Sequence, residues 1–509
     1  MTSMWKRGRV LGTVGGSLAA LAFVAVPGMA TAATAAPATV KLSTGALGMN
    51  IPPWNSLYAS GGSSNTLQSL LKNAHVTQIH YGGGQYADDY DWQTNTSITA
   101  CPTTALSEYK AKCASSNALP FSIFSQKARA IGAQSFVTVN YGSGTPAEAA
   151  AEVKAAKKSG QQVGLWEIGN ENYGCWEANN WLADAPEDFK GYRPTVDATC
   201  PMVKDGTDAG MTIVAKSYAA NAAKFMSAMK AANPSAVLGV PYAFDSSVGG
   251  ASVADNTEWD NAVLSGDKKY IGFVDLHWYP LSYGGSTGAG ANPTAQTVIQ
   301  TVLQIPAEYA AVKAEMASQG VGGAKVVVGE TGVSYLATNT SCTAVGALFS
   351  AGDALQWLSS GASAVDWWTM NGQGNTGTTC SKPDEGMFTS NKKPVPDAYY
   401  TGYLLAGDLA QPGAKLSKIN LPAAVSGSVL AYQSILASGK TQVLLINTST
   451  TAAQTVTFGS ALGGKLTKVT YKASNQNSFG TKTTSASTTA AAVKAGLVLP
   501  AESITLLKA

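Results

Sequence analysis

The chain has 509 residues, of which 45% are hydrophobic and only 13% carry a charge. This apolar fraction suffices for a full core and excludes a long disordered protein, and the length suits a barrel of about 250–400 residues with a further domain. Three of the 34 basic residues and none of the 31 acidic residues lie in residues 1–35, so the remaining chain holds 31 of each charge. A nucleic-acid-binding protein normally has a basic excess, and we therefore exclude nucleic acid as a partner. The three histidines are too few for a His-rich metal site, and we expect no metal and no other cofactor.

Residues 1–35 have the organisation of a secretory signal peptide. A basic segment precedes an apolar stretch, a proline and two candidate cleavage sites: Lys6, Arg7 and Arg9; Val10–Val26; Pro27; and the Ala-Thr-Ala sequences at 30–32 and 33–35. An uncleaved membrane anchor is the alternative, but glycine and serine interrupt the apolar stretch, which is short for a span of about 20 residues. We predict that the protein is secreted, extracellular and without a membrane partner after cleavage.

Six cysteines agree with export, because an even count in a secreted chain favours disulfides. Six cysteines allow 15 connectivities, and we favour pairs of sequence neighbours. These pairs are Cys101–Cys113, Cys175–Cys200 and Cys342–Cys380. The alternative, a metal cluster, would need closely spaced cysteine pairs of the Cys-x-x-Cys type, and the sequence has none.

From Thr44 to Asp408, short apolar strands alternate with helical stretches. Strands are expected to end near Asn50, Tyr81, Asn140, Glu171, Pro241, Glu330 and Asn371, with another at Ile271–Trp278. Helices are expected at Thr66–Ala74, Pro146–Lys158, Met211–Ala232, Thr294–Ser318 and Val345–Ser359. Eight such repeats predict an α/β fold, a (β/α)8 TIM barrel over residues 36–408. A doubly wound open sheet is the alternative, but the Gly-rich phosphate turn that it normally carries is missing after the first strand.

Short β-type runs separated by Gly, Ser and Asn fill residues 409–509 and predict an all-β sandwich domain. The expected strands are Val429–Leu436, Thr441–Asn447, Gln454–Phe458, Leu466–Tyr471, Gly496–Leu499 and Ile504–Leu507. The low-complexity stretch Thr481–Ala492 is expected to be a long loop.

Two predicted strands, the fourth and the seventh, carry a glutamate where they open into their loops, namely Glu171 and Glu330. Chemistry in a TIM barrel belongs at these carboxyl ends. Two carboxylates facing across a cleft are what glycoside hydrolysis requires, one as a proton donor and one as a nucleophile or base. Each glutamate could instead be a structural carboxylate at a strand end.

The motifs around these glutamates resemble those of clan A glycoside hydrolases. The sequence Trp-Glu-Ile-Gly-Asn-Glu-Asn-Tyr-Gly at 166–174 resembles the Gly-Asn-Glu motif of the acid/base in that clan. Residues 78–92, 137–145 and 276–280 resemble motifs of strands two, three and six in family 51 α-L-arabinofuranosidases. The three glycines at 82–84 also resemble family 79, the glucuronidase and heparanase group.

The resemblance implies roles for individual residues. Glu171 would be the general acid/base and Glu330 the nucleophile. Asn170 would bind the sugar hydroxyl next to the reacting carbon, and Tyr279 would orient the nucleophile with His277 beside it. One position departs from the pattern. His80 stands where relatives usually have an arginine that helps to keep the nucleophile ionised, so either the site differs or another cation takes that part.

Further residues are expected to bind substrate. Asn140 and Asn371, at the ends of strands three and eight, are candidate partners for sugar hydroxyls. Trp166 is a candidate for stacking on a sugar ring; of Trp367 and Trp368, strand alternation allows at most one to point into the barrel. The acidic run Asp88, Asp89 and Asp91 is interpreted as a solvated loop or as turn caps.

These observations predict a secreted retaining exo-glycosidase that acts on polysaccharide or oligosaccharide. An arabinofuranoside is the leading substrate. A family 79-like β-glucuronidase or another pyranosidase is the second hypothesis, and a non-catalytic carbohydrate-binding barrel is the third.

Overall fold

The computed structural model describes residues 38–509, except for 54, 60, 98–117, 162, 175–207, 244–256, 267, 282–292, 335–337, 372–384, 390–393, 458–461 and 473–482. Residues from Pro37 to Ala509 form one compact unit. The predicted signal peptide lies outside the described residues. None of the helices in the described part of the chain combines the length and the apolar character that a membrane crossing requires.

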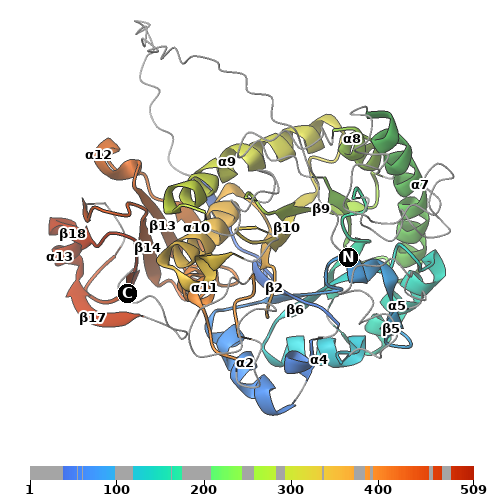
Figure 1. Cartoon of the computed structure of the whole chain (residues 1–509), viewed down its shortest axis with the longest axis horizontal. Coiled ribbons are helices and arrows are strands. Elements are labelled where there is room, and N and C mark those ends of the chain that lie inside the picture. Colours follow the sequence, from blue (N-terminus) through green and yellow to red (C-terminus); the bar gives the residue numbers. More distant parts are fainter. Residues whose placement is uncertain are drawn as a thin grey trace, which may run out of the picture. The chain divides into compact units, whose positions relative to one another are not determined.

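Eight parallel strands close into a barrel, which confirms the predicted fold (Figure 1). In chain order they are β2 (Leu47–Ile51), β3 (Gln78–Tyr81), β6 (Gln134–Val139), β7 (Val163–Ile168), β8 (Leu238–Tyr242), β9 (Ile271–Trp278), β10 (Lys325–Thr331) and β11 (Ala364–Trp367). The ring closes where β11 pairs with β2. The predicted strand at Ile271–Trp278 has the observed bounds.

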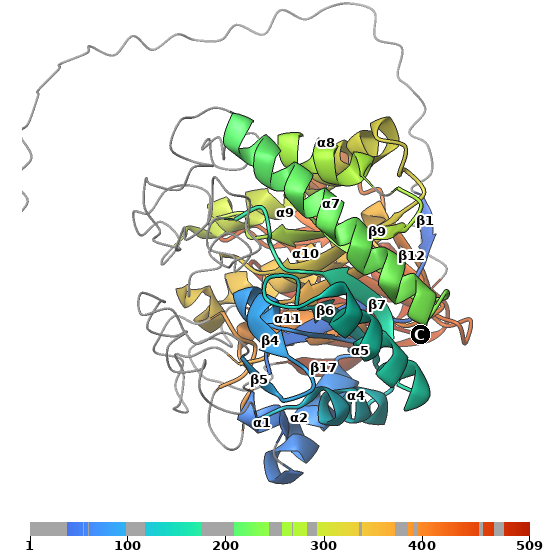
Figure 2. The ribbon, with the colours of Figure 1, turned by 90° about the vertical axis from the view of Figure 1, so that its right-hand side faces the viewer.

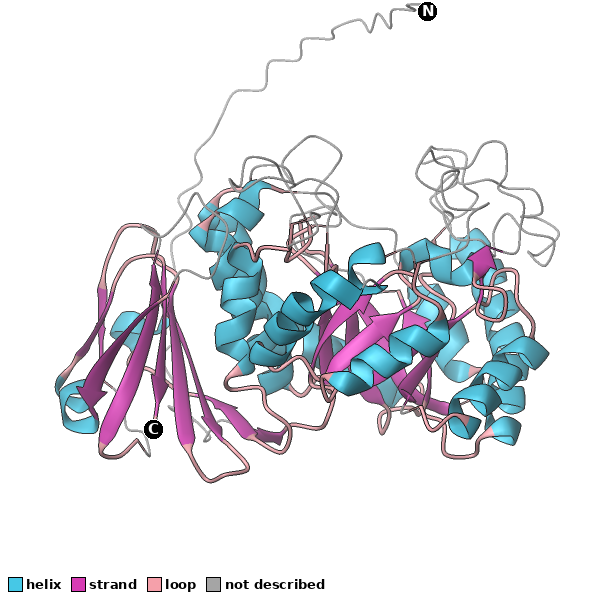
Figure 3. Ribbon diagram, turned by 90° about the horizontal axis from the view of Figure 1, so that it is seen from below, coloured by secondary structure: helices cyan, strands magenta, loops and turns pink. Residues whose placement is uncertain are grey.

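Helices surround the strands on the outside of the barrel (Figure 3). The main ones are α2 (Gly61–Asn73), α4 (Phe121–Ala130), α5 (Pro146–Lys158), α7 (Asp208–Ala232), α8 (Thr257–Ser265), α9 (Ala295–Ser318), α10 (Ala344–Ser360) and α11 (Ala398–Gly407). Local signals fix α5. The Thr145 hydroxyl accepts from the amide of Glu148 at 3.2 Å, which caps the N-terminus of the helix, and donates to the Glu148 carboxylate at 2.9 Å.

Strand alternation divides the barrel interior into layers. One layer is apolar and is built from five strands: Phe136, Leu165, Phe273, Val327 and Ala364. Two residues further along several of these strands, the inward side chains become polar. This polar layer lies between the apolar core and the carboxyl ends of the strands, where the candidate site is located.

The C-terminal domain is built on a seven-stranded antiparallel sheet in the order β1, β12, β13, β14, β19, β16, β17, beside a two-stranded sheet of β15 and β18. These strands are β1 (Thr39–Lys41), β12 (Lys415–Lys418), β13 (Val429–Ile435), β14 (Thr441–Asn447), β15 (Gln454–Val456), β16 (Lys465–Lys472), β17 (Thr484–Thr489), β18 (Leu497–Leu499) and β19 (Ser503–Lys508).

Two features of this domain differ from the sequence expectation. The predicted loop at Thr481–Ala492 is wrong, since it contains the edge strand β17 and the start of α13 (Ala490–Ala495). Threonine favours strands, and β17 pairs with β16 along its whole length. The strand β1 lies within the range expected for the barrel, yet it pairs with β12 of the C-terminal sheet.

Helix α10 joins the barrel to the C-terminal sheet. A single buried cluster contains residues of both, including Leu355 of α10 and Leu444 of β14. The Tyr432 hydroxyl donates to Gln356 of α10 at 2.5 Å. Figure 2, turned by 90° from Figure 1, shows the long helix α7 running along the outside of the barrel.

Candidate active site

The loop after β7 begins with a tight turn that carries Glu171. Gly169 has φ +74°, and a Cβ at this position would collide with the Asn172 side chain. Glu171 itself has φ +41°, a left-handed conformation that costs a non-glycine residue on the order of 1–3 kcal/mol. The surrounding structure must therefore hold this glutamate in place.

Asp88 provides that support from the loop after β3. Its Oδ2 accepts from the Asn170 amide at 3.2 Å and from Asn172 Nδ2 at 2.8 Å, and its Oδ1 accepts from the Tyr141 amide at 3.2 Å. Asp88 and Asp89 are fully buried, so the interpretation of this run as a solvated loop is wrong for both. Sequence reasoning missed Asp88 because its partners are distant along the chain.

The second glutamate, Glu330, lies near the end of β10 after an irregularity. The register with β9 shifts between Val328 and Glu330. Gly329 sits in this shift, and a Cβ there would collide with the Asp275 carboxylate. Its amide donates to Asp275 Oδ1 at 2.6 Å, and its carbonyl accepts from Asn50 Nδ2 at 2.6 Å. Both peptide groups before Glu330 are thus fixed by side chains, one from the neighbouring strand β9 and one from β2.

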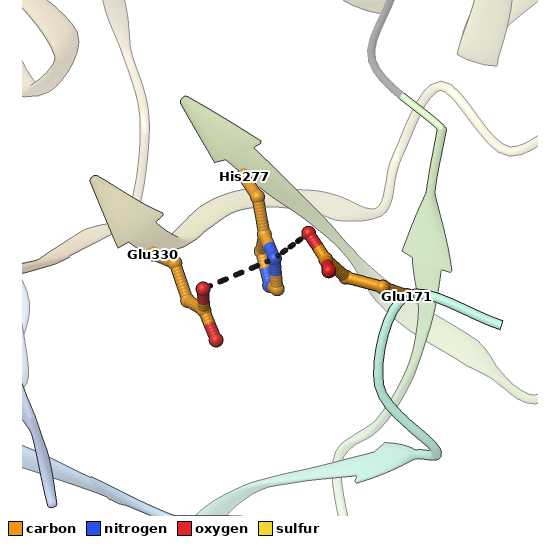
Figure 4. Close-up of side chains that lie close together, drawn as sticks. All are labelled: Glu171, His277 and Glu330. Carbon is orange, nitrogen blue, oxygen red and sulfur yellow. Dashed lines mark hydrogen bonds and ion pairs between the residues drawn. The ribbon is translucent and has the colours of Figure 1, made fainter. Parts of the chain in front are cut away.

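His277 lies between the two glutamates (Figure 4). Its Nδ1 is 2.8 Å from Glu171 Oε1 and 3.4 Å from Glu330 Oε2. The Tyr279 hydroxyl donates to Glu330 Oε2 at 2.6 Å, and the Tyr173 hydroxyl donates to Glu171 Oε1 at 3.2 Å. The two carboxylates are therefore close together but have different hydrogen-bond partners.

Burial also differs between the carboxylates. The Glu330 side chain is 6% exposed and that of Glu171 is 20% exposed. Burial raises the pKa of Glu330, and the His277 charge and the Tyr279 hydroxyl act in the opposite direction. Burial by itself would lower the pKa of His277, but the charges of Glu330 and Glu171 and the contact with Asp275 raise it well above its usual value.

His80 is buried below this group and does not bridge it. Its Nδ1 is 3.1 Å from the Gly329 carbonyl, its Nε2 is 2.8 Å from Thr138 Oγ1, and its ring stacks on Phe136 at 3.7 Å. Burial lowers the pKa of His80 to about 4. This histidine is therefore neutral near pH 7 and cannot supply the positive charge of the arginine that relatives carry.

Three other predicted residues make their hydrogen bonds or ring contacts with groups other than the two glutamates. Asn140 makes its amide hydrogen bonds to Tyr90, Ser143 and Gly144, within the loops after β3 and β6. Asn371 bonds Asn55 and Thr389. The expectation that Trp166 stacks on a sugar is wrong: Leu165 and Glu167 point into the barrel, so the Trp166 ring points outward. It is 2% exposed and packs near Phe121 of α4 at 6.3 Å.

The adjacent tryptophans Trp367 and Trp368 differ in burial and in their contacts. Trp367 is buried against Tyr399, with ring centroids 4.7 Å apart. Trp368 is half-buried, and its ring lies against Gly84 in the loop after β3. Of the two adjacent tryptophans, only Trp368 presents its ring at the end of the barrel where the glutamates lie.

Three ligand atoms of Glu171, His277 and Glu330 lie within 4.8 Å of one another, which is close enough for a cation to contact all three. The same atoms take part in the hydrogen bond and the ion pair described above.

Cys342 is disulfide-bonded, and the described residues contain no free cysteine. Its expected partner Cys380 and the remaining cysteines, Cys101, Cys113, Cys175 and Cys200, lie outside the described residues. The pairing therefore stays a prediction.

The fold of the barrel and the C-terminal sheet is similar to that of several solved glycoside hydrolases. A family 51 α-L-arabinofuranosidase from Thermotoga petrophila matches with a TM-score of 0.67 at 16% identity, covering 92% of this chain and 97% of that chain. A 4-O-α-L-rhamnosyl-β-D-glucuronidase from Fusarium oxysporum matches with a TM-score of 0.61 at 17% identity, over 92% and 97%. A family 44 xyloglucanase from Paenibacillus polymyxa matches with a TM-score of 0.58 at 11% identity, over 91% and 99%. No protein-family model and no curated protein sequence matches the chain.

Proposed function

We propose that the protein is a secreted, retaining glycoside hydrolase that cleaves polysaccharide or oligosaccharide by double displacement. The observation that carries the proposal is the pair Glu171 and Glu330, whose facing oxygens lie within 4.8 Å. Retaining enzymes hold their carboxyl groups about 5–5.5 Å apart, whereas inverting enzymes need roughly 6.5–9.5 Å to admit a water molecule. The spacing supports the retaining mechanism.

Glu330 is the nucleophile in this proposal. Its Oε2 is held by Tyr279 and faces His277, whereas its Oε1 is buried and has no hydrogen-bond partner among the described residues. Oε1 is therefore the oxygen that attacks the anomeric carbon. The attack forms a glycosyl ester and breaks the bond to the leaving oxygen.

Glu171 is the acid and then the base. Its Oε1 accepts from Tyr173 and faces His277 Nδ1, which favours the proton on Oε2. That proton passes to the leaving oxygen. Ester formation removes the negative charge of Glu330, so Glu171 can now stay ionised and take a proton from the water that hydrolyses the ester.

An arabinofuranoside released from the chain end is the leading substrate. The support is the set of motifs resembling family 51 together with the fold shared with arabinofuranosidases. A β-glucuronide is the second candidate, supported by the glycine run at 82–84 and by the fold shared with the Fusarium oxysporum glucuronidase. Half-buried Trp368 beside Gly84 provides an aromatic face for either ring.

The decisive experiment combines a panel of nitrophenyl glycosides with azide rescue of two variants. Glu330→Ala should lose nearly all activity, and azide should restore turnover with inversion. Glu171→Ala should keep the first step on a leaving group that needs no proton, and azide should rescue it with retention. The opposite stereochemistry would exchange the two roles. Wild-type rates in both variants would place catalysis elsewhere, and an inactive wild type that still binds sugar would favour the carbohydrate-binding alternative.

A further inference from the structure

Below the two glutamates, the barrel interior holds a buried polar layer that the proposed mechanism does not yet use. Glu167 of β7 accepts from Thr138 Oγ1 at 2.9 Å and lies 3.9 Å from His80 Nε2. Asp275 of β9 is 1% exposed and Glu167 is fully buried. Isolated ions are costly in such surroundings unless they are paired, so the charges in this layer need partners.

Asp275 contacts both sides of the candidate site. Its Oδ1 accepts from the Gly329 amide at 2.6 Å, next to Glu330 in the chain. Its Oδ2 lies 3.7 Å from Nε2 of His277, two residues further along the same strand. The distance to His277 is that of an ion pair rather than of a hydrogen bond. One carboxylate thus holds the backbone before Glu330 and faces the histidine between the glutamates.

The charged and polar groups around His277 indicate how the Asp275 carboxylate acts on the imidazole. Nδ1 faces Glu171 and Glu330, Nε2 faces Asp275, and Glu167 and His80 lie in the layer below. Neutral His80 offers no positive charge. Burial and the charge of Asp275 raise the pKa of Glu167 well above its usual range. Asp275 is the carboxyl group that faces Nε2 of His277.

We propose that Asp275 is a positioning residue that keeps the His277 imidazole protonated on both nitrogens, so that His277 serves as the cation between the two catalytic carboxylates. This inference rests on the proposed function for the roles of Glu171 and Glu330. With Nε2–H directed at Asp275, Nδ1–H points at the glutamates. The positive charge then stabilises the one negative charge that the two carboxyl groups carry between them, on Glu330 before the attack and on Glu171 once the ester has formed. Asp275 and His277 together take the part of the arginine that His80 replaces.

The test measures the protonation state of each histidine. The chain has three, so nitrogen NMR of histidine-labelled protein resolves each imidazole. In the wild type, His277 should be doubly protonated from pH 6 to 8, whereas His80 should be neutral. In Asp275→Asn, the pKa of His277 should fall by about one unit or more, the size expected when an opposite charge is removed from this distance. A neutral His277 at pH 7 in the wild type overturns the proposal even if the variant does not fold.

Asp366→Asn is the matched control. Asp366 is buried in the same barrel interior, but it bonds Gln78 Nε2 at 2.8 Å, and its replacement should not move the titration of His277. With an active enzyme, Asp275→Asn should also shift the alkaline limb of kcat/KM to lower pH, because His277 would lose its proton at a lower pH than in the wild type. A purely structural role would lower the rate equally at all pH values. The NMR titration does not depend on activity, so failure of the proposed function and failure of this inference are distinguishable.

Discussion

The hydroxyl of Tyr279 is 2.6 Å from Glu330 Oε2 and lies closer to the proposed nucleophile than His277 Nδ1 does, at 3.4 Å. This hydrogen bond lowers the pKa of Glu330. In Tyr279→Phe the pKa of Glu330 should therefore rise. Because attack requires ionised Glu330, the acid limb of the pH profile of kcat/KM should move to higher pH. A charge-assisted bond is worth about 1.5–3 kcal/mol, so kcat/KM should fall about 10- to 100-fold. A pH profile of kcat/KM measures both effects.

The control for this variant is Tyr403→Phe. Tyr403 is also fully buried, and its hydroxyl bonds the carbonyls of Gly48 and Val365 on the helix side of the barrel. Loss of the Tyr403 hydroxyl should reduce stability without moving the acid limb of the pH profile of kcat/KM. If the limb stays in place in Tyr279→Phe as well, Tyr279 does not assist the ionisation of Glu330.

Asp88 should affect catalysis without being near the reacting bond. In Asp88→Ala, the Asn170 and Tyr141 amides and the Asn172 side chain lose their acceptor, at a cost of about 1–3 kcal/mol for each group left unpaired. The left-handed turn at Glu171 is then free to relax. We expect kcat to fall more than KM rises, since the acid moves while the sugar contacts remain. Steady-state kinetics should separate Asp88→Ala from Asp91→Ala, which removes a turn acceptor for Gln93 in the same loop.

These residues also mark how far the sequence can be interpreted. Glu171, Glu330 and Tyr279 follow from motifs at strand ends, where position in the chain fixes position in the barrel. Asp88 and Asp275 could not be predicted, because their partners lie on other strands and loops. The outward orientation of Trp166 was accessible in principle: strand alternation that directs Glu167 inward directs Trp166 outward.

Helix α5 carries an acid on its buried face. Glu152 is 4% exposed, and burial, with a contribution from Asp91, raises its pKa to about 8. The unfolded chain ionises this group above its ordinary value of 4.5, whereas the folded protein keeps the proton. The wild type should therefore lose stability relative to Glu152→Gln as the pH rises from 5 to 8, by an amount on the order of a few kcal/mol.

Denaturant unfolding at pH 5 and pH 8 tests this effect. Glu148→Gln on the same helix is the control, because Glu148 is only partly buried and bonds the Thr145 hydroxyl in the first turn of the helix. Its effect should be equal at the two pH values. A difference between Glu152→Gln and the wild type that does not change with pH would show that Glu152 is ionised in the folded state.

The predictability of whole elements follows from the range of the interactions that form them. The bounds of α5 could be predicted because its cap, its Pro146 start and its final lysines are local signals. The strand β17 could not, since most of its residues are exposed and its assignment depends on pairing with β16. The pairing of β1 with β12 joins two strands that lie on either side of the whole barrel in the sequence, and no local pattern encodes it.

The burial of α10 bears on whether the barrel and the sheet are separate folding units. All residues from Ala344 to Leu358 are buried, whereas an ordinary barrel helix keeps one exposed face. A Cβ atom placed on Gly352 of α10 would lie 3.6 Å from the Leu430 side chain and 3.7 Å from the Ile446 side chain, both in the C-terminal sheet. Without the sheet, this face of α10 would be open to water. We therefore expect residues 36–408 and 409–509 to unfold together rather than as two independent domains.

Tryptophan fluorescence can test this, because residues 409–509 contain no tryptophan and the signal reports the barrel alone. Ile446→Ala removes a fully buried side chain of the sheet and should destabilise the fluorescence-detected transition by about 2–5 kcal/mol. Circular dichroism should report the same midpoint. Val498→Ala is the control, since Val498 is an apolar residue of the same domain that is 59% exposed, and it should change stability by less than about 0.5 kcal/mol. If Ile446→Ala leaves the tryptophan transition in place and moves only a separate dichroism transition, the two domains fold independently and the shared core around α10 does not couple them.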